Sequence, residues 1–422
     1  MNRRTFASAS RLALLGLAIA GVASVPARAD DTKAPASWWS TFSWSGYADG
    51  GITANPDSPN NGIDYGNLYG DRANLPMLNQ LSLIATRPTD PKATGPDFGF
   101  TFQPMYGTDA RYTHFYNEFD RSINSRYQFD IVEADVLAHL PYVGSGGTDI
   151  KLGQYPTPIG YEVINPTQNP LYSHSYIYEF GIPIKHTGVL TTTHVTPLLD
   201  IYLGLDTGNL DDVGTTGMAN RTYAHELGGF GLNLLGGNLT IVALTHVGPE
   251  NPASGPNGVP FADSTNRYFN DVVVTYKYND SLSFATELNY VKDDITLANG
   301  SNPDAYGFAQ YVTYTINDMF TFQGRGEVWR DNNGFFAAAF PANFDFTDAG
   351  RGLANTAYNA GKATYSEVTL GINFTPPGVP DMFKGAKIRP EIRWDHADQA
   401  KPFDDQTRNS QVTLAADLIL PF

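Results

Sequence analysis

Charged side chains occupy every second position of one segment near the end of the chain. In "KIRPEIRWDH", Lys387, Arg389, Glu391, Arg393 and Asp395 alternate with Ile388, Pro390, Ile392 and Trp394. Successive side chains of a β-strand point to opposite faces, so the five charges would share one wet face. Acids and bases that face each other across water create a field that sorts solutes by charge.

Other segments carry charges in the same phase. An Arg or Lys on a lipid-facing position costs about 2 to 4 kcal/mol at mid-membrane, so this phase favours an aqueous interior. For any one residue, an ion pair that only braces the wall explains the charge equally well. The residues predicted to line a pore are Lys277, Glu287, Arg325, Glu327, Glu367, Lys387, Arg389, Glu391, Arg393 and Asp395.

A long link rich in Tyr, Pro and Asn forms a second candidate site. Residues 157–182 contain "PTPIGYE" and "NPTQNP", turn-forming runs that could pack inside a barrel mouth and constrict it. An external loop folded on itself explains the composition equally well. The candidate solute contacts of this constriction loop are Tyr161, Glu162, Tyr172 and His174.

A smaller charged feature is "YGTDARYTH", at the outer end of an early strand pattern. Asp109 and Arg111 are two residues apart and would point the same way on a strand. We expect a local salt bridge between them rather than a selector at the rim of a pore.

Signals of catalysis are weak. The 8 His residues are scattered without metal-ligand spacing, and the chain has no HExxH, GxSxG or phosphate-cradling motif. We therefore expect no enzyme activity, no cofactor and no metal. A barrel-wall hydrolase using the strand "HTGVLTTTH" is a less favoured alternative, because a catalytic triad is defined by geometry.

The elements that would position these residues are strands of about ten residues with period-two alternation, the length of a tilted transmembrane strand. We identify sixteen candidates between Phe42 and Phe422. In "YQFDIVEADVLAHL" the phase changes midway, as at a β-bulge or in a wrong register. Short links such as "GG" at 236–237 alternate with long ones such as 331–361. The sequence thus predicts an antiparallel up-and-down transmembrane β-barrel with short periplasmic turns and long extracellular loops.

The ends of the chain agree with export to a membrane. Met1–Ala29 combines basic residues, the apolar run "LALLGLAIAGVASV" and "ARA", which predicts a secretory signal peptide followed by a barrel over residues 30–422. The segment "SQVTLAADLILPF" predicts a closing strand, with Val412, Leu414, Ala416, Leu418 and Leu420 facing lipid. Leu418, Leu420 and Phe422 are the predicted assembly signal, and aromatic residues near the short links predict a periplasmic girdle.

The blocks "YGTDARYT" and "TPIGYEVINP…NPLYSHSY" resemble the putative β-barrel porin-2 (OmpL-like) family of bacterial outer-membrane proteins. The resemblance is strongest over residues 98–190 and implies a porin in the outer membrane of a Gram-negative bacterium. It implies passive diffusion of small hydrophilic solutes or ions, and no catalytic residues follow from it.

The expected partners are outer-membrane lipid and lipopolysaccharide, the barrel-assembly machinery, small hydrophilic solutes and a second and third copy in a homotrimer. Nucleic acid is excluded, because the formal net charge is −16 and binding to it needs a basic surface. That acidic balance weakly favours cations, whereas Lys387, Arg389 and Arg393 could favour anions locally. A soluble secreted β-rich protein that binds or cleaves glycans is the main alternative.

Overall fold

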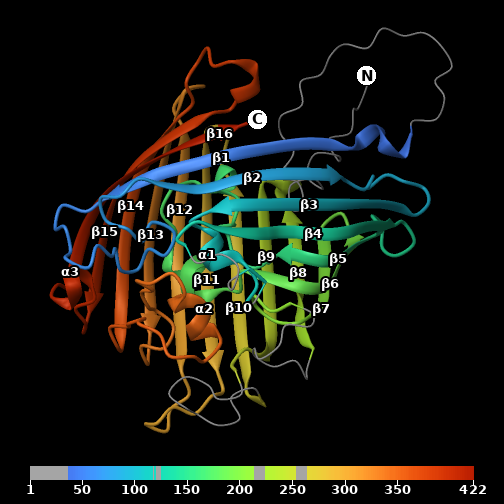
Figure 1. Cartoon of the computed structure of the whole chain (residues 1–422). Helices are drawn as coiled ribbons and strands as arrows, with labels where there is room; N and C mark the ends of the chain where they lie inside the picture. Colours follow the sequence, from blue (N-terminus) through green and yellow to red (C-terminus); the bar gives the residue numbers. More distant parts are fainter. Residues whose placement is uncertain (1–36, 117, 120–124, 213–223, 253–263) are drawn as a thin grey trace.

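Sixteen antiparallel strands close into one barrel, in which every strand pairs with its neighbours in sequence and β1 pairs with β16 (Figure 1). This computed structural model describes residues 37–116, 118–119, 125–212, 224–252 and 264–422. The expected signal peptide lies outside the described residues. Within them, no helix is long and apolar enough to cross a membrane. The closed barrel confirms the predicted fold class and strand number.

The strands of the first half are β1 (Ser43–Ala54), β2 (Met77–Arg87), β3 (Asp97–Gly107), β4 (Gln128–Leu140), β5 (Thr148–Pro156), β6 (Lys185–Thr196), β7 (Leu199–Asp206) and β8 (His225–Leu234). Those of the second half are β9 (Leu239–Pro249), β10 (Asn266–Lys277), β11 (Leu282–Asp293), β12 (Asp304–Thr315), β13 (Phe320–Asp331), β14 (Ala363–Phe374), β15 (Lys387–Asp398) and β16 (Ser410–Pro421). Short helices in the links are α1 (Ala110–Thr113), α2 (Asp345–Gly350) and α3 (Phe403–Gln406).

Alternation along each strand separates an outer apolar face from an inner polar face. On β16, Val412, Leu414 and Leu418 are exposed on the outside, whereas Thr413 and Asp417 are buried on the inside. The same division holds along β13, β14 and β15, where the predicted phase matches the observed burial pattern. Exposed apolar side chains of this kind are the surface that a transmembrane barrel presents to lipid.

The phase change in β4 is a β-bulge. Gln103 of β3 pairs with Glu133 and Pro104 pairs with Ile131, so Val132 has no opposite residue. The apolar and polar positions of β4 change parity at Val132. Because the bulge accommodates this one extra residue, the side chains on both sides of it still point to the correct faces of the barrel. Val132 is buried inside the wall as a result.

The shortest links between strands lie at one end of the barrel and the longest lie at the other. The short turns, such as 235–238, 278–281 and 316–319, are at the end where both described termini lie, together with the longer link 375–386; the longest loops, such as 157–184 and 332–362, start from the other end (Figure 1). In barrels of this type the short turns are periplasmic. Aromatic side chains are exposed around this end; they include Trp44, Phe98, Tyr276, Tyr278, Tyr314 and Phe422.

Phe422 extends the pairing that closes the barrel. Its N–H donates to the carbonyl of Gly46 at 2.9 Å, and the Gly46 N–H donates back to the Phe422 carbonyl at 2.7 Å. A Cβ at position 46 would lie 2.5 Å from the Phe422 ring, so only glycine lets the ring rest on β1 here.

Loops from the long-loop end fill part of the lumen. The β1–β2, β3–β4, β5–β6 and β13–β14 links contribute to one buried cluster rich in aromatic rings. Tyr176 stacks on Tyr365 with 4.8 Å between ring centroids, and Tyr65 stacks on Tyr358 at 5.6 Å. Part of the barrel interior is therefore a packed core of loop and wall side chains.

Candidate functional site

The link between β5 and β6, residues 157–184, lies inside the barrel against the wall formed by β11 to β16. We call it the inner segment. It contains η2 (Pro166–Gln168) and η3 (Ile177–Gly181), and nearly all of its residues are buried or half-buried. Its many proline and asparagine residues favour turns, so the segment follows a compact, irregular path. Its main-chain N–H and C=O groups therefore lack the hydrogen-bond partners that a regular helix or sheet would supply and must find others.

Arginines of β13 and β15 supply donors to the main chain of the inner segment. Guanidinium groups present several N–H donors in a fixed fork, so each can bind a carbonyl and a carboxylate together. All three arginines are buried. The bonds to the inner segment run from Arg325 Nη1 to the Ser173 carbonyl (2.7 Å), from Arg389 Nη1 to the Asn169 carbonyl (2.9 Å) and from Arg393 Nη1 to the His174 carbonyl (2.6 Å).

Glutamates of the same wall accept hydrogen bonds from main-chain N–H groups of the inner segment. These carboxylates are buried, and the amides reduce the cost of taking their charge out of water. The bonds run to Glu287 from Tyr161 (3.0 Å), to Glu327 from Tyr176 (2.7 Å) and Ile177 (2.8 Å), and to Glu391 from Tyr172 (2.8 Å) and Ser173 (3.1 Å).

Glu162 is the inner segment's own charged anchor. Its carboxylate accepts from Arg325 Nη1 at 2.8 Å and from the Tyr311 hydroxyl at 3.0 Å, and lies 2.6 Å from His174 Nδ1. Burial alone would raise the pKa of this carboxyl, but the Arg325 charge and the hydrogen bonds from His174 and Tyr311 outweigh it and lower the pKa to about 2. Glu162 is therefore ionised throughout the neutral range.

The ten charges predicted to line a pore divide into two groups. Lys277 is exposed at the short-turn end, where it pairs with Asp280 at 2.8 Å. The other nine lie along the wall that the inner segment covers, and Lys387 Nζ donates to the Thr167 carbonyl at 3.3 Å. Glu367 and Asp395 pair with Arg325 and Arg393, respectively. Contact of any of the ten with solute stays a prediction.

The four candidate solute contacts all lie on the inner segment within the lumen. Glu162, Tyr172 and His174 are buried, and Tyr161 is partly exposed. Tyr172 donates its hydroxyl hydrogen to Asn79 Oδ1 at 3.0 Å. Their role as solute contacts stays a prediction, as does constriction of the pore by residues 157–182.

The expected salt bridge between Asp109 and Arg111 is wrong. Arg111 belongs to α1, so it turns away from Asp109 and pairs with Asp71 at 3.0 Å. Asp109 instead accepts hydrogen bonds from Asn79 at 3.0 Å and from Gln80 at 2.9 Å. The strand geometry assumed for "YGTDARYTH" ends at Gly107, which removes the basis of that expectation.

The wall opposite the inner segment carries an inward cluster of charged side chains that no sequence motif marks. His194 Nδ1 lies 2.6 Å from Asp200, its Nε2 lies 3.0 Å from Asp149, and Lys151 lies 2.5 Å from Glu133. These residues belong to β4, β5, β6 and β7 near the short-turn end. The side chains of Asp149 and Lys151 are 21% and 20% exposed, so this wall meets water. The period-two spacing of Asp149 and Lys151 was the available signal.

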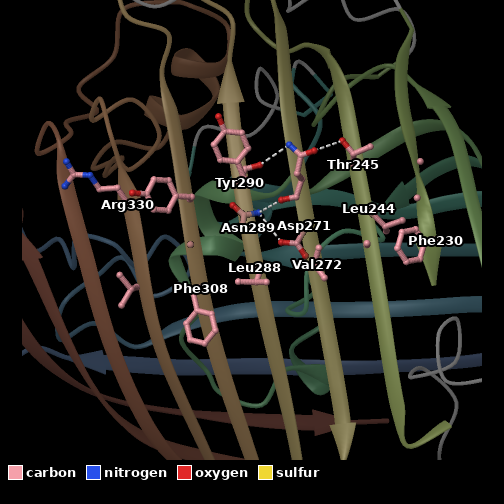
Figure 2. A pocket seen from close by; sticks show the side chains of 17 residues that line it. Phe230, Leu244, Thr245, Asp271, Val272, Leu288, Asn289, Tyr290, Phe308 and Arg330 are labelled. Atoms are coloured by element: carbon pink, nitrogen blue, oxygen red, sulfur yellow. Dashed lines mark hydrogen bonds between the residues drawn. The ribbon is translucent and has the colours of Figure 1, made fainter. Parts of the chain in front are cut away.

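A hollow of about 710 Å³ lies on the outer face of β8 to β13 (Figure 2). Phe230, Leu288 and Phe308 border it and are exposed. Thr245 donates to Asn270 Oδ1 at 3.0 Å, and Arg330 at the border donates to Thr364 at 2.8 Å, so the polar groups on this mainly apolar surface have partners. The hollow therefore faces lipid rather than the lumen.

A closed barrel with an apolar exterior, a charged interior and a loop folded into the lumen defines an outer-membrane channel. Three solved structures share the fold over 90% of this chain: the outer membrane channel DcaP of Acinetobacter baumannii (11% identity, 97% of that chain, TM-score 0.53), the anion-selective porin from Comamonas acidovorans (10%, 99%, 0.54) and OprB of Pseudomonas putida (11%, 94%, 0.53). No curated protein sequence matches the chain.

The chain belongs to the family described as putative beta-barrel porin-2, OmpL-like, whose model matches residues 41–422. The protein is accordingly a porin of the bacterial outer membrane, as the sequence blocks indicated. Membership in a porin family favours a channel over an enzyme.

Proposed function

We propose that small hydrophilic solutes diffuse through a path bounded by the inner segment on one side and by β4 to β7 on the other. The observation that carries this proposal is the anchoring of residues 157–184 to the charged wall of β11 to β15. A segment fixed in this way narrows the lumen without closing off the opposite wall. Neutral sugars of increasing size test it: a variant lacking the inner segment's anchors should pass larger sugars than the native protein does.

We further propose that the path prefers cations. The basic groups Arg389 and Arg393 are engaged by carboxylates and by carbonyls of the inner segment, so they are unavailable to attract anions. The wall of β4 to β7 instead carries Asp149, whose side chain is 21% exposed, and the buried Asp200; their partners are His139 and His194. Lys151 of the same wall is engaged by Glu133 and Asp135. A carboxylate wall raises the local concentration of cations in a narrow path.

The reversal potential in a planar bilayer under a salt gradient tests this preference. The native protein should show a cation-selective potential, and the double variant Asp149→Asn, Asp200→Asn should move it toward zero. Asp280→Asn is the matched control, because Asp280 is a fully exposed turn residue at the same end of the barrel. An anion-selective native channel, or an equal shift in the control, would refute the proposal.

The outer hollow supports lipid as a partner of this protein, since its apolar border fits an acyl chain of outer-membrane lipid or lipopolysaccharide. Recognition by the barrel-assembly machinery and association as a homotrimer are further proposals. We expect no phospholipid hydrolysis by the purified protein; activity lost on substitution of a wall hydroxyl would instead favour a barrel hydrolase.

A further inference from the structure

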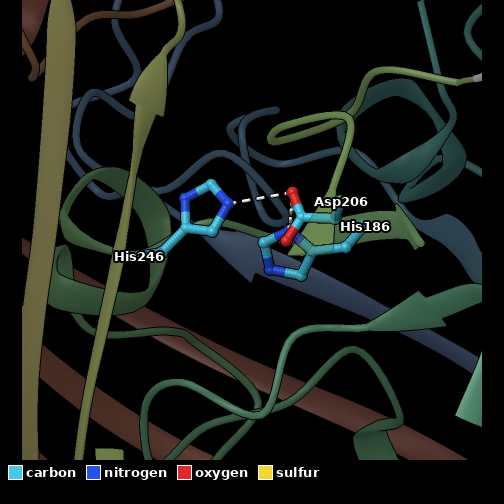
Figure 3. Close-up of side chains that lie close together, drawn as sticks. All are labelled: His186, Asp206 and His246. Atoms are coloured by element: carbon cyan, nitrogen blue, oxygen red, sulfur yellow. Dashed lines mark hydrogen bonds and ion pairs between the residues drawn. The ribbon is translucent and has the colours of Figure 1, made fainter. Parts of the chain in front are cut away.

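Four adjacent strands place a titratable side chain inward near the long-loop end of the barrel. His186 of β6, Asp206 of β7, His225 of β8 and His246 of β9 are all buried, and Glu250 follows β9 directly. They are far apart in the sequence, so no motif reveals them. The rings of His186 and His246 both approach the Asp206 carboxylate, and their centroids are 4.6 Å apart (Figure 3).

The separations in this cluster suit a metal ion. His246 Nε2 lies 3.0 Å from Asp206 Oδ1, His186 Nδ1 lies 3.4 Å from the same oxygen, and all three ligand atoms are within 4.8 Å of one another. Ligands at about 2.0 to 2.1 Å from a tetrahedral zinc ion are roughly 3.3 Å apart. The two shorter separations are close to that value, and only the third pair needs to approach.

Three polar atoms of the cluster lack a hydrogen bond, although His246 Nε2 and Asp206 Oδ1 share one at 3.0 Å. His186 Nδ1, His246 Nδ1 and Asp206 Oδ2 are buried and have no hydrogen-bond partner. A buried polar group left unpaired costs about 1 to 3 kcal/mol, so such atoms seldom gather without a reason. A metal ion would satisfy His186 Nδ1 and the Asp206 carboxylate together.

The groups behind the ligands hold them as outer partners of a metal site do. His186 Nε2 lies 3.0 Å from Thr157 Oγ1, which leaves Nδ1 as the free ligand atom. His246 Nδ1 lies 3.5 Å from Glu250 Oε1, which leaves Nε2 facing Asp206. Metal-ligating histidines generally have their second ring nitrogen hydrogen-bonded to an oxygen. His186 meets this condition through Thr157, and His246 would meet it if Glu250 moved slightly closer.

Charge balance also favours a cation. Among the residues that the structure describes, only histidines form ion pairs with Asp206 and Glu250. With neutral imidazoles, the two buried carboxylates would leave the cluster strongly negative, which is costly away from water. One divalent cation would neutralise both.

We propose that His186, Asp206 and His246 bind a divalent transition-metal ion, for which Zn²⁺ is the best match. Two imidazoles and one carboxylate suit such an ion, whereas Ca²⁺ and Mg²⁺ require mainly oxygen ligands. The ion would tie β6, β7 and β9 together where the long loops leave the barrel. This inference stands apart from the proposed selectivity, because the cluster is buried.

Metal content of the folded, detergent-purified protein tests the proposal. After chelation, addition of Zn²⁺ and desalting, the native protein should retain one zinc per chain by mass spectrometry. Asp206→Asn keeps the side-chain shape and should weaken Zn²⁺ binding by more than the 10- to 100-fold typical for loss of an outer partner. His396→Asn is the control, since His396 lies beside a carboxylate on β15, outside the cluster.

A second measurement on the native protein covers the case in which Asp206→Asn fails to fold. Co²⁺ should give visible absorption bands that one equivalent saturates and Zn²⁺ abolishes. Zn²⁺ should also raise the temperature at which the native protein and His396→Asn lose folded migration on a gel. Native protein that retains no zinc and gives no Co²⁺ bands would overturn the proposal, as would a folded Asp206→Asn variant that binds zinc as the native protein does.

Discussion

Replacing Arg325 with methionine should release the inner segment from the wall. Arg325 is fully buried and binds the Ser173 carbonyl, Glu162 and Glu367 at once. Methionine replaces the unbranched stem of arginine but lacks the guanidinium group, so both carboxylates would lose their cationic partner. Breaking a buried ion pair by removing one member costs about 3 to 5 kcal/mol.

That cost acts on the segment more than on the barrel, because the sixteen-strand ladder does not depend on Arg325. Since about 1.4 kcal/mol corresponds to a factor of ten, the population with a detached segment should rise by about two to four powers of ten. In a planar bilayer this would appear as larger conductance steps or as frequent excursions to them. The double variant Arg325→Met, Glu162→Gln should show a smaller increase in conductance than Arg325→Met, because one of the two unpaired carboxylates is gone.

Lys277→Met is the matched control for Arg325→Met. It also removes a cation from the set predicted to line a pore, but Lys277 is exposed and pairs only with a turn residue. Surface pairs of that kind contribute about 0 to 1 kcal/mol, so conductance should stay native. Equal conductance and equal thermal stability for Arg325→Met, Lys277→Met and the native protein would refute the anchoring role of the wall.

Three further predictions concern pH, lipid contact and assembly. The pKa of Glu162 is lowered from 4.5 to about 2 in the folded protein, so ionised Glu162 stabilises the fold by at most about 3 kcal/mol. This contribution is complete above pH 4.5 and is lost as the pH falls toward 2. Glu162→Gln should therefore make the thermal stability less dependent on pH over that interval. Val368→Arg should destabilise the folded barrel by about 2 to 4 kcal/mol in refolding titrations, because Val368 is exposed on the lipid face of β14; an unchanged midpoint would contradict this orientation. Deleting Phe422 should reduce insertion into the outer membrane more than the conductance of inserted channels, whereas Phe374→Ala should insert normally.

The features that sequence predicted well are those set by local alternation. The charges of β15 repeat at every second residue with apolar residues between them, and only one phase places them away from lipid. The phase change in β4 was readable for the same reason, although only the pairing of Gln103 with Glu133 shows that Val132 is the bulge.

The features that sequence could not supply depend on contacts between distant strands. The bonds between Arg389 and the Asn169 carbonyl, or between Glu391 and the amide of Tyr172, join residues whose meeting depends on the path of an irregular loop. The Tyr, Pro and Asn content of residues 157–182 indicated an irregular loop but did not indicate which wall residues it would contact. His186 and His246 come together only because β6 and β9 belong to the same curved part of the barrel wall and both side chains point inward.

Apart from the side chains of Glu162, Ser173 and Tyr176, the inner segment is bound to the wall by its main chain, and main-chain atoms are the same in every residue but proline. A different sequence that keeps these three residues and follows the same path could therefore be held by the same wall. Side chains such as that of Tyr161, which is partly exposed, are then free to vary with little effect on the support beneath them. If the inner segment constricts the pore as proposed, a few substitutions in this one segment would alter which solutes pass while the membrane-spanning strands are kept.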